Sequence, residues 1–221
     1  PSILKSGSTS INNFKYKGVS MSFTTLLKTN CGISQVSLET KFFDKRCINI
    51  NGAITDALAL DFTDKILELN LESDQPITIL INSLGGEINS GLLMYDAIVG
   101  SKAPIRMICR GRAYSMGAIL FACANERYML PNSELMLHQP ILGGNVAGNA
   151  SSIKSISDSM LETKRKLNGL LSKHTGKTEE EIDIATSFDH YFLPDEAIGF
   201  NLCDKVIDFA KVIDLIKEEE W

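Results

Sequence analysis

Short apolar runs alternate with amphipathic stretches along most of the chain. Residues 77–82 (ITILIN) are apolar and β-branched, which is typical of a buried strand. Other short apolar runs are expected to be strands as well: residues 46–50, 105–110, 127–130 and 134–138. Apolar positions at helical spacing predict helices over residues 56–71, over residues 89–100 and from about Ser115. This alternation predicts an α/β fold with a largely parallel sheet and helices packed on it.

The longest helical pattern covers residues 151–176, after the glycine-rich segment 141–150. Its apolar positions are Ile153, Ile156, Met160, Leu167, Leu170 and Leu171, and Gly176 is a plausible stop. At about 1.5 Å per residue the helix is on the order of 35 Å long, which is much for one small domain. The sequence leaves two interpretations open, a projecting arm or a helix packed on the domain. Residues 193–208 then predict a short helix and a final strand.

The composition is that of an ordinary globular protein, with 44% hydrophobic and 22% charged residues in a chain of 221. A net charge of −5 argues against a surface that binds nucleic acid. The most apolar stretch, Ala113 to Ala124, is too short to span a bilayer, so we expect no membrane segment.

The cysteines show neither a disulfide framework nor a zinc site, because their number is odd and no CxxC pair occurs. They are Cys31, Cys47, Cys109, Cys123 and Cys203. Cys109 and Cys123 lie in apolar runs, so we expect buried thiols and a cytoplasmic location. Residues 1–20 are polar and lack the apolar segment of a secretory signal, and we assign them no function.

A pair of glycines, Gly85 and Gly86, follows the predicted strand 77–82 and precedes a predicted helix. Paired glycines permit positive φ and leave backbone N–H groups unobstructed, so this turn is able to present a donor to an anionic oxygen. The alternative is a tight turn without chemistry. The segment is neither a phosphate-binding loop nor a dinucleotide-binding fingerprint, because the required lysine or third glycine is missing.

A serine stands where a strand ends and a helix begins in GRAYSMGAIL, residues 111–120. Ser115 is either a helix N-cap or a nucleophile directed into a cleft. If the helix starts there, the N–H groups of Met116 and Gly117 have no intrahelical partner. The serine oxygen and an oxyanion donor would then be adjacent.

Three histidines are available as a partner for this serine. His138 ends the predicted strand 134–138 and is either a structural core residue or a general base. His174 lies near a helix C-terminus, where a cation is favourable, and His190 lies in a loop-like segment. Asp189 is one of many carboxylates that could orient an imidazole, so residue types alone leave a triad open.

Several segments, in this order, resemble the proteolytic subunit of the ATP-dependent Clp protease, the ClpP family: INSLGG, GRAYSMGA, RYMLPNSELMLHQP, LLSKHTGKTEEEI and SFDHYFLPDEAIGFNLCDKVI. The likeness runs from about residue 42 to 208. It implies a crotonase-like α/β fold whose long helix, about residues 149–174, is a projecting handle. Residues 1–41 would be an atypical N-terminal arm and axial-loop segment, and residues 209–221 a C-terminal tail.

The resemblance implies a serine endopeptidase that degrades unfolded polypeptides to short peptides. Ser115 falls on the nucleophile of the family, His138 on its base and Asp189 on its acid. The oxyanion donors fall on the backbone N–H groups of Gly86 and Met116.

Substrate binding and assembly are also implied by the resemblance. The apolar edge around Ile88 and the turn from Ile141 would bind substrate as an added strand. In this family the handle interleaves two heptameric rings into a tetradecamer with a closed chamber. An AAA+ unfoldase such as ClpX or ClpC uses ATP to feed that chamber, and the subunit itself binds no nucleotide, needs no metal or cofactor, and contacts neither nucleic acid nor membrane.

Three departures from the family pattern indicate a second, specialised ClpP paralogue that works in mixed rings. Leu84 replaces the usual proline of the glycine motif, and residues 21–41 do not resemble the axial loop. His190 stands where the family commonly has an arginine that couples the rings. Two alternative functions are therefore kept: a weakly active or structural subunit of a mixed ring, and an acyl-CoA-binding enzyme of the crotonase type.

The histidine at position 190 predicts that ring pairing is weaker than in the family or depends on pH, because histidine titrates near neutrality. Sedimentation velocity between pH 6 and pH 8.5 measures the ratio of single to double rings. We expect this ratio to change across that range. An equally stable double ring throughout would contradict the prediction.

Overall fold

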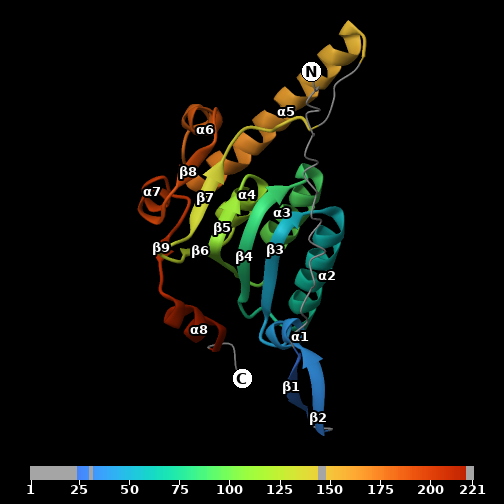
Figure 1. The fold of residues 1–221 in the computed structure, drawn as a ribbon, viewed down its shortest axis with the longest axis vertical. Coiled ribbons are helices and arrows are strands. Elements are labelled where there is room, and N and C mark those ends of the chain that lie inside the picture. Colours follow the sequence, from blue (N-terminus) through green and yellow to red (C-terminus); the bar gives the residue numbers. More distant parts are fainter. Residues whose placement is uncertain (1–23, 30–31, 144–147, 218–221) are drawn as a thin grey trace, which may run out of the picture. The chain divides into compact units, whose positions relative to one another are not determined.

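The computed structural model describes residues 24–29, 32–143 and 148–217 (Figure 1). The chain divides into two compact units, one up to Leu38 and one from Glu39. The described part of the first unit is an antiparallel hairpin of β1 (Thr24–Thr29) and β2 (Gly32–Ser37). The expectations for residues 1–20 lie outside the described residues.

The second unit is built on a sheet that has seven strands within the described residues. They are β3 (Cys47–Ile54), β4 (Ile77–Gly86), β5 (Ile105–Tyr114), β6 (Glu126–Met129), β7 (Glu134–Leu137), β8 (His190–Phe192) and β9 (Lys205–Val206). The order is β3-β4-β5-β6-β9, with β7 beside β5 and β8 beside β7. Only the β7–β8 pair among these is antiparallel, so the predicted, largely parallel α/β sheet is confirmed.

The helices of the described residues include every helix that the pattern predicted. They are α1 (Leu38–Phe43), α2 (Asp56–Glu72), α3 (Ile88–Gly100), α4 (Met116–Ala122), α5 (Ala150–Thr175), α6 (Glu179–Thr186), α7 (Pro194–Gly199) and α8 (Phe209–Lys217). The last of these lies in the segment that the sequence analysis set apart as a C-terminal tail. It buries Val212 and Leu215 in a cluster with Leu80 and Ile108 of the sheet, so one face of this helix is part of the packed unit.

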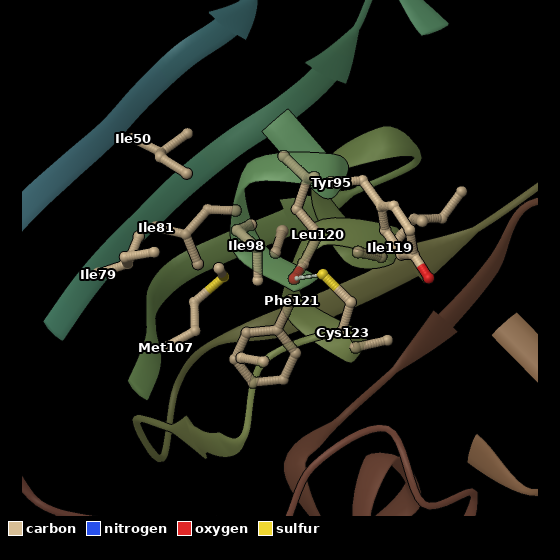
Figure 2. Packing of buried hydrophobic residues seen from close by; sticks show 14 of the residues in the cluster. Ile50, Ile79, Ile81, Tyr95, Ile98, Met107, Ile119, Leu120, Phe121 and Cys123 are labelled. Carbon is tan, nitrogen blue, oxygen red and sulfur yellow. Dashed lines mark hydrogen bonds between the residues drawn. The ribbon is translucent and has the colours of Figure 1, made fainter. Parts of the chain in front are cut away.

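The main core lies between the sheet and helices α2, α3 and α4. Figure 2 shows side chains of the sheet, among them Ile79, Ile81 and Met107, beside residues of α3 and α4. In α2 the buried positions are Ala59, Phe62, Ile66 and Leu69. Leu60 and Leu67 of this helix are 53% and 60% exposed. The helix is therefore amphipathic with an additional apolar stripe on its outer side.

The long helix α5 projects from the sheet along its N-terminal part (Figure 1). Its buried residues, Leu167, Asn168, Leu171 and Thr175, all lie in its last third. The helix ends at Gly176, which takes the left-handed C-cap conformation with φ of 71°, as the sequence predicts. The projecting-arm interpretation is confirmed for this helix. Among the helices of the described residues, none joins sufficient length to sufficient apolar character to cross a membrane.

Four cysteines, Cys47, Cys109, Cys123 and Cys203, are buried, and Cys31 lies outside the described residues. Burial raises the pKa of the Cys109 thiol and of the Cys203 thiol to about 11. Burial also raises the pKa of Cys123. The expectation of buried thiols at Cys109 and Cys123 is confirmed.

This burial predicts that the four thiols of a Cys31→Ser variant are inert in the folded protein. A chromogenic disulfide reagent at pH 8 is expected to modify none of them within minutes, because each thiol is buried and burial raises the pKa of Cys109, Cys123 and Cys203. All four should react in guanidinium chloride, which provides the control. A thiol that reacts rapidly in the native protein would contradict the prediction.

Candidate active site

Six of the seven residues that the sequence analysis proposed for the site line one pocket of about 120 Å³. They are Gly86, Ile88, Ser115, Met116, His138 and Ile141. The seventh, Asp189, lies behind His138, with its carboxylate oxygen Oδ1 3.8 Å from the imidazole Nδ1. Residues from four separate parts of the chain thus meet at the carboxyl ends of parallel strands β4 and β5.

The backbone of Ser115 turns sharply between β5 and α4. Its φ of 53° and ψ of −121° lie outside the regions that a serine ordinarily occupies. Its N–H donates to the carbonyl oxygen of Met136 at 2.8 Å, which ties the turn to β7. The hydroxyl makes no capping hydrogen bond to α4, so the N-cap interpretation is wrong for this side chain. A strained serine that caps nothing is free to act in the pocket.

Two close approaches of the β4 backbone require glycine, at Gly85 to this turn and at Gly86 to β3. Gly85 and Gly86 have φ of 84° and 157°. A Cβ atom on Gly85 would lie 2.7 Å from the carbonyl oxygen of Tyr114 and 2.8 Å from the Cβ of Ser115. A Cβ atom on Gly86 would lie 2.1 Å from the carbonyl oxygen of Ile54. A side chain at Gly85 would separate β4 from the turn at Ser115, and a side chain at Gly86 would separate β4 from β3.

The first turn of α4 presents backbone donors to the pocket. The N–H groups of Ala118 and Ile119 donate to the carbonyl oxygen of Ser115. Within the described part of the chain, the N–H groups of Met116 and Gly117 make no hydrogen bond. The oxyanion donor expected at Met116 therefore has its N–H unpaired beside Ser115.

The sheet register places His138 and Asp189 opposite each other. Leu137 of β7 pairs with His190 of β8, and the two candidate residues are the next positions along these antiparallel strands. The His138 side chain is 14% exposed, whereas that of Asp189 is 59% exposed. Their separation of 3.8 Å is that of an ion pair and is too long for a hydrogen bond. Ser115 and His138 share the pocket, although among the described residues no hydrogen bond joins their side chains.

Further pocket residues were not proposed from the sequence. The base of α5 contributes Leu167, Asn168 and Leu171, and α4 contributes Ile119. Asn168 is 6% exposed, and its Nδ2 donates to Oδ1 of Asp183 at 3.1 Å. The sequence signal for Asn168 was a polar residue on the apolar side of a helix. Its place in the pocket depends on the packing of α5 against α4, which spacing along the chain does not specify.

Near the pocket, the side chain of His190 contacts Glu196 and Phe192. Its Nε2 lies 2.9 Å from Oε1 of Glu196, and its ring stacks on Phe192 with centroids 4.1 Å apart. Over the part of the chain that the structure describes, no three His, Cys, Asp or Glu side chains gather as ligands of a metal ion would.

Comparison with known proteins gives a match between residues 32–210 and the model of the family described as Clp protease. The match covers most of the chain, and it contains every residue of the candidate site. The mostly parallel sheet with its flanking helices agrees with the ClpP/crotonase-like fold of that family.

The close approach at Gly85 predicts that Gly85→Ala is strongly destabilising. The new methyl group meets the Tyr114 carbonyl and Ser115 in a backbone conformation that alanine disfavours. We expect the free energy of unfolding to fall by about 2–4 kcal/mol, measured by denaturant unfolding.

Gly100→Ala is the matched control, because a Cβ atom at this end of α3 would meet nothing within 4 Å. Its stability should equal or slightly exceed that of the wild type. Equal stabilities of the two variants would contradict the geometry at Gly85.

Proposed function

Because the chain belongs to the Clp protease family, we propose that it is the proteolytic subunit of an ATP-dependent Clp protease that cuts unfolded polypeptides into short peptides. Serine peptidase activity is the general activity of that family. The observation that carries the proposal is the single pocket that holds Ser115, His138, Gly86 and Met116. Asp189 stands behind the histidine at ion-pair distance.

In the proposed mechanism His138 takes the proton of the Ser115 hydroxyl as the oxygen attacks a peptide carbonyl. Asp189 orients the imidazole and stabilises the imidazolium that forms. The carboxylate must approach by about 1 Å to reach hydrogen-bond length, a tightening that catalytic pairs undergo when substrate binds. His138 then gives its proton to the leaving amine, and water releases the acyl group by the same steps in reverse.

The N–H groups of Met116 and Gly86 are the proposed donors to the oxyanion of the tetrahedral intermediate. Support comes from the unpaired N–H of Met116 beside the nucleophile and from the position of Gly86 in the same pocket. Loss of one such donor typically lowers the rate by roughly 10²–10³. Gly85 contributes as well, because it lets β4 approach the turn at Ser115 closely enough for the Gly86 N–H to lie in this pocket.

The pocket itself is suited to an apolar side chain of the substrate. Ile88, Ile119 and Leu171 line it together with the stem of Met116. Ile141 is 70% exposed at its rim, where the chain runs on from β7. We propose that substrate lies as an added strand between the segments of Ile88 and Ile141, bound through main-chain hydrogen bonds that tolerate many sequences.

The projecting part of α5 supports the proposed assembly. Ile153 and Leu161 are about half exposed on this helix, at 49% and 52%, which suits a helix that packs against another subunit. The proposal is two heptameric rings joined through these handles into a closed chamber. An AAA+ unfoldase such as ClpX or ClpC would deliver unfolded chains with ATP, so the subunit itself would need no cofactor.

The proposal predicts that the purified protein hydrolyses a short fluorogenic peptide with an apolar residue before the scissile bond. Ser115→Ala should lower kcat by at least about 10⁴, because the nucleophile is lost. Ser73→Ala is the matched control and should retain wild-type activity, since Ser73 caps α2 at the opposite end of β4 from the pocket.

The ring size of each sample, measured by sedimentation, separates the remaining outcomes. Turnover that depends on Ser115 in a double ring supports a peptidase that is active alone. An assembled double ring that hydrolyses no peptide would contradict catalysis by this subunit and favour a structural role in a mixed ring. Single rings that hydrolyse no peptide would mean that a partner subunit is required, which co-assembly with a ClpP paralogue would test.

A further inference from the structure

A row of three side chains crosses β5, β7 and β8 on the face of the sheet opposite the main core. Tyr114 pairs with Met136, and Met136 pairs with Tyr191. The alternate positions along the same strands, Ala113 and Leu135, are fully buried in the core. Because side chains alternate between faces, the row points to the other side of the sheet.

Two contacts hold the side chain of Tyr114 in place. Its hydroxyl donates to the carboxylate of Glu134, which lies on the same face two residues before Met136. Its ring meets that of Tyr191 edge to face, with centroids 5.7 Å apart and planes at 86°. Burial and the Glu134 carboxylate raise the pKa of Tyr114 to about 12, so the phenol remains a donor at every pH at which the protein is studied.

The row lies directly beside the proposed triad. Ser115 follows Tyr114, His138 is two residues after Met136, and Asp189 is two residues before Tyr191. His138 and Asp189 lie one position beyond these strands, after Leu137 and before His190. The aromatic contact thus bridges the strand that carries the nucleophile and the strand that follows the acid.

The strand that follows Asp189 needs such a restraint. β8 is three residues long and pairs with β7 alone in the described sheet. On the core side it is anchored by Phe192, which is 1% exposed. On the other side Tyr191 is 47% exposed and rests against Tyr114. The Asp189 side chain is itself 59% exposed, so its position follows from that of its strand.

We propose that Tyr114, held by Glu134, is a positioning residue that sets Asp189 against His138 through the ring of Tyr191. This inference rests on the proposed function, because it assigns a role within that triad. Tyr114 and Tyr191 touch none of the reacting atoms in it, and they act only through the acid. The charged and titratable groups that face Tyr114 are Arg112 on its own strand, Glu134 on β7 and Tyr191 on β8.

The testing variant is Tyr114→Phe, which keeps the ring and removes the hydrogen bond to Glu134. We expect kcat for the fluorogenic peptide to fall about fivefold to tenfold with little change in KM, the size of effect that one hydrogen bond produces. The acid limb of the kcat profile should move to lower pH, because a less closely held carboxylate stabilises the imidazolium less.

Tyr128→Phe is the matched control. The hydroxyl of Tyr128 also donates to a glutamate, Oε2 of Glu126 at 3.0 Å, but on β6 away from the pocket. Tyr128→Phe should leave kcat and the pH profile unchanged. A second pair of variants tests the ring contact: Tyr191→Leu should repeat the effect of Tyr114→Phe, whereas Tyr191→Phe should not, since it retains the aromatic edge.

Titration of the His138 ring by NMR provides a readout that does not require turnover, with His138→Gln to assign the signal. The proposal expects the ring to lose its proton at lower pH in Tyr114→Phe than in the wild type. Unchanged titration and unchanged kcat would overturn it, and so would equal effects from Tyr128→Phe. Absence of hydrolysis dependent on Ser115 in the wild type would overturn the proposed function instead, while the titration would still decide whether Tyr114 positions Asp189.

Discussion

The contact between Gly85 and the turn at Ser115 is the constraint on which the site depends. The backbone of β4 lies so close to the β5–α4 turn that a Cβ atom on Gly85 would fall within 3 Å of both the Tyr114 carbonyl and Ser115. Ser115 takes a positive φ at that point, a conformation that costs of order 1–3 kcal/mol in a residue other than glycine. This approach alone puts the backbone of Gly86 and that of Met116 into one pocket with the serine.

Packing of α4 holds the strained turn in place. Every residue of this helix, Met116 to Ala122, is buried, so it cannot shift without opening the core between the sheet and α3. Gly91 of α3 leaves room for Met116, since a Cβ atom there would lie 2.1 Å from its Cγ. The proposed nucleophile and the proposed oxyanion donor at Met116 thus stand at the start of a fully buried helix, as electrostatic preorganisation requires.

The proposed base and the proposed acid are held differently. His138 follows a central strand, whereas Asp189 precedes the short edge strand β8 and is more than half exposed. Ser115 stands at a buried helix, whereas Asp189 precedes an edge strand with few contacts. The position of Asp189 therefore depends on the side chains that cover β8. Tyr114 and Tyr191 supply such a cover within the subunit.

Much of this protein was determined by its sequence alone. Buried strands such as 77–82 and the helical periodicity of 151–176 predicted the α/β sheet and the long helix, because these signals are local. Several motifs that follow one another in the order of the Clp protease family predicted the family and, through it, the site residues. The packed helix α8 and the pocket walls of Ile119, Asn168 and Leu171 were decided by tertiary structure, since they arise where segments far apart in the chain meet. The same holds for the use of Ser115: local sequence allowed an N-cap or a nucleophile, and only the approach of Gly85 and the bond to Met136 produced the strained turn that excludes a cap.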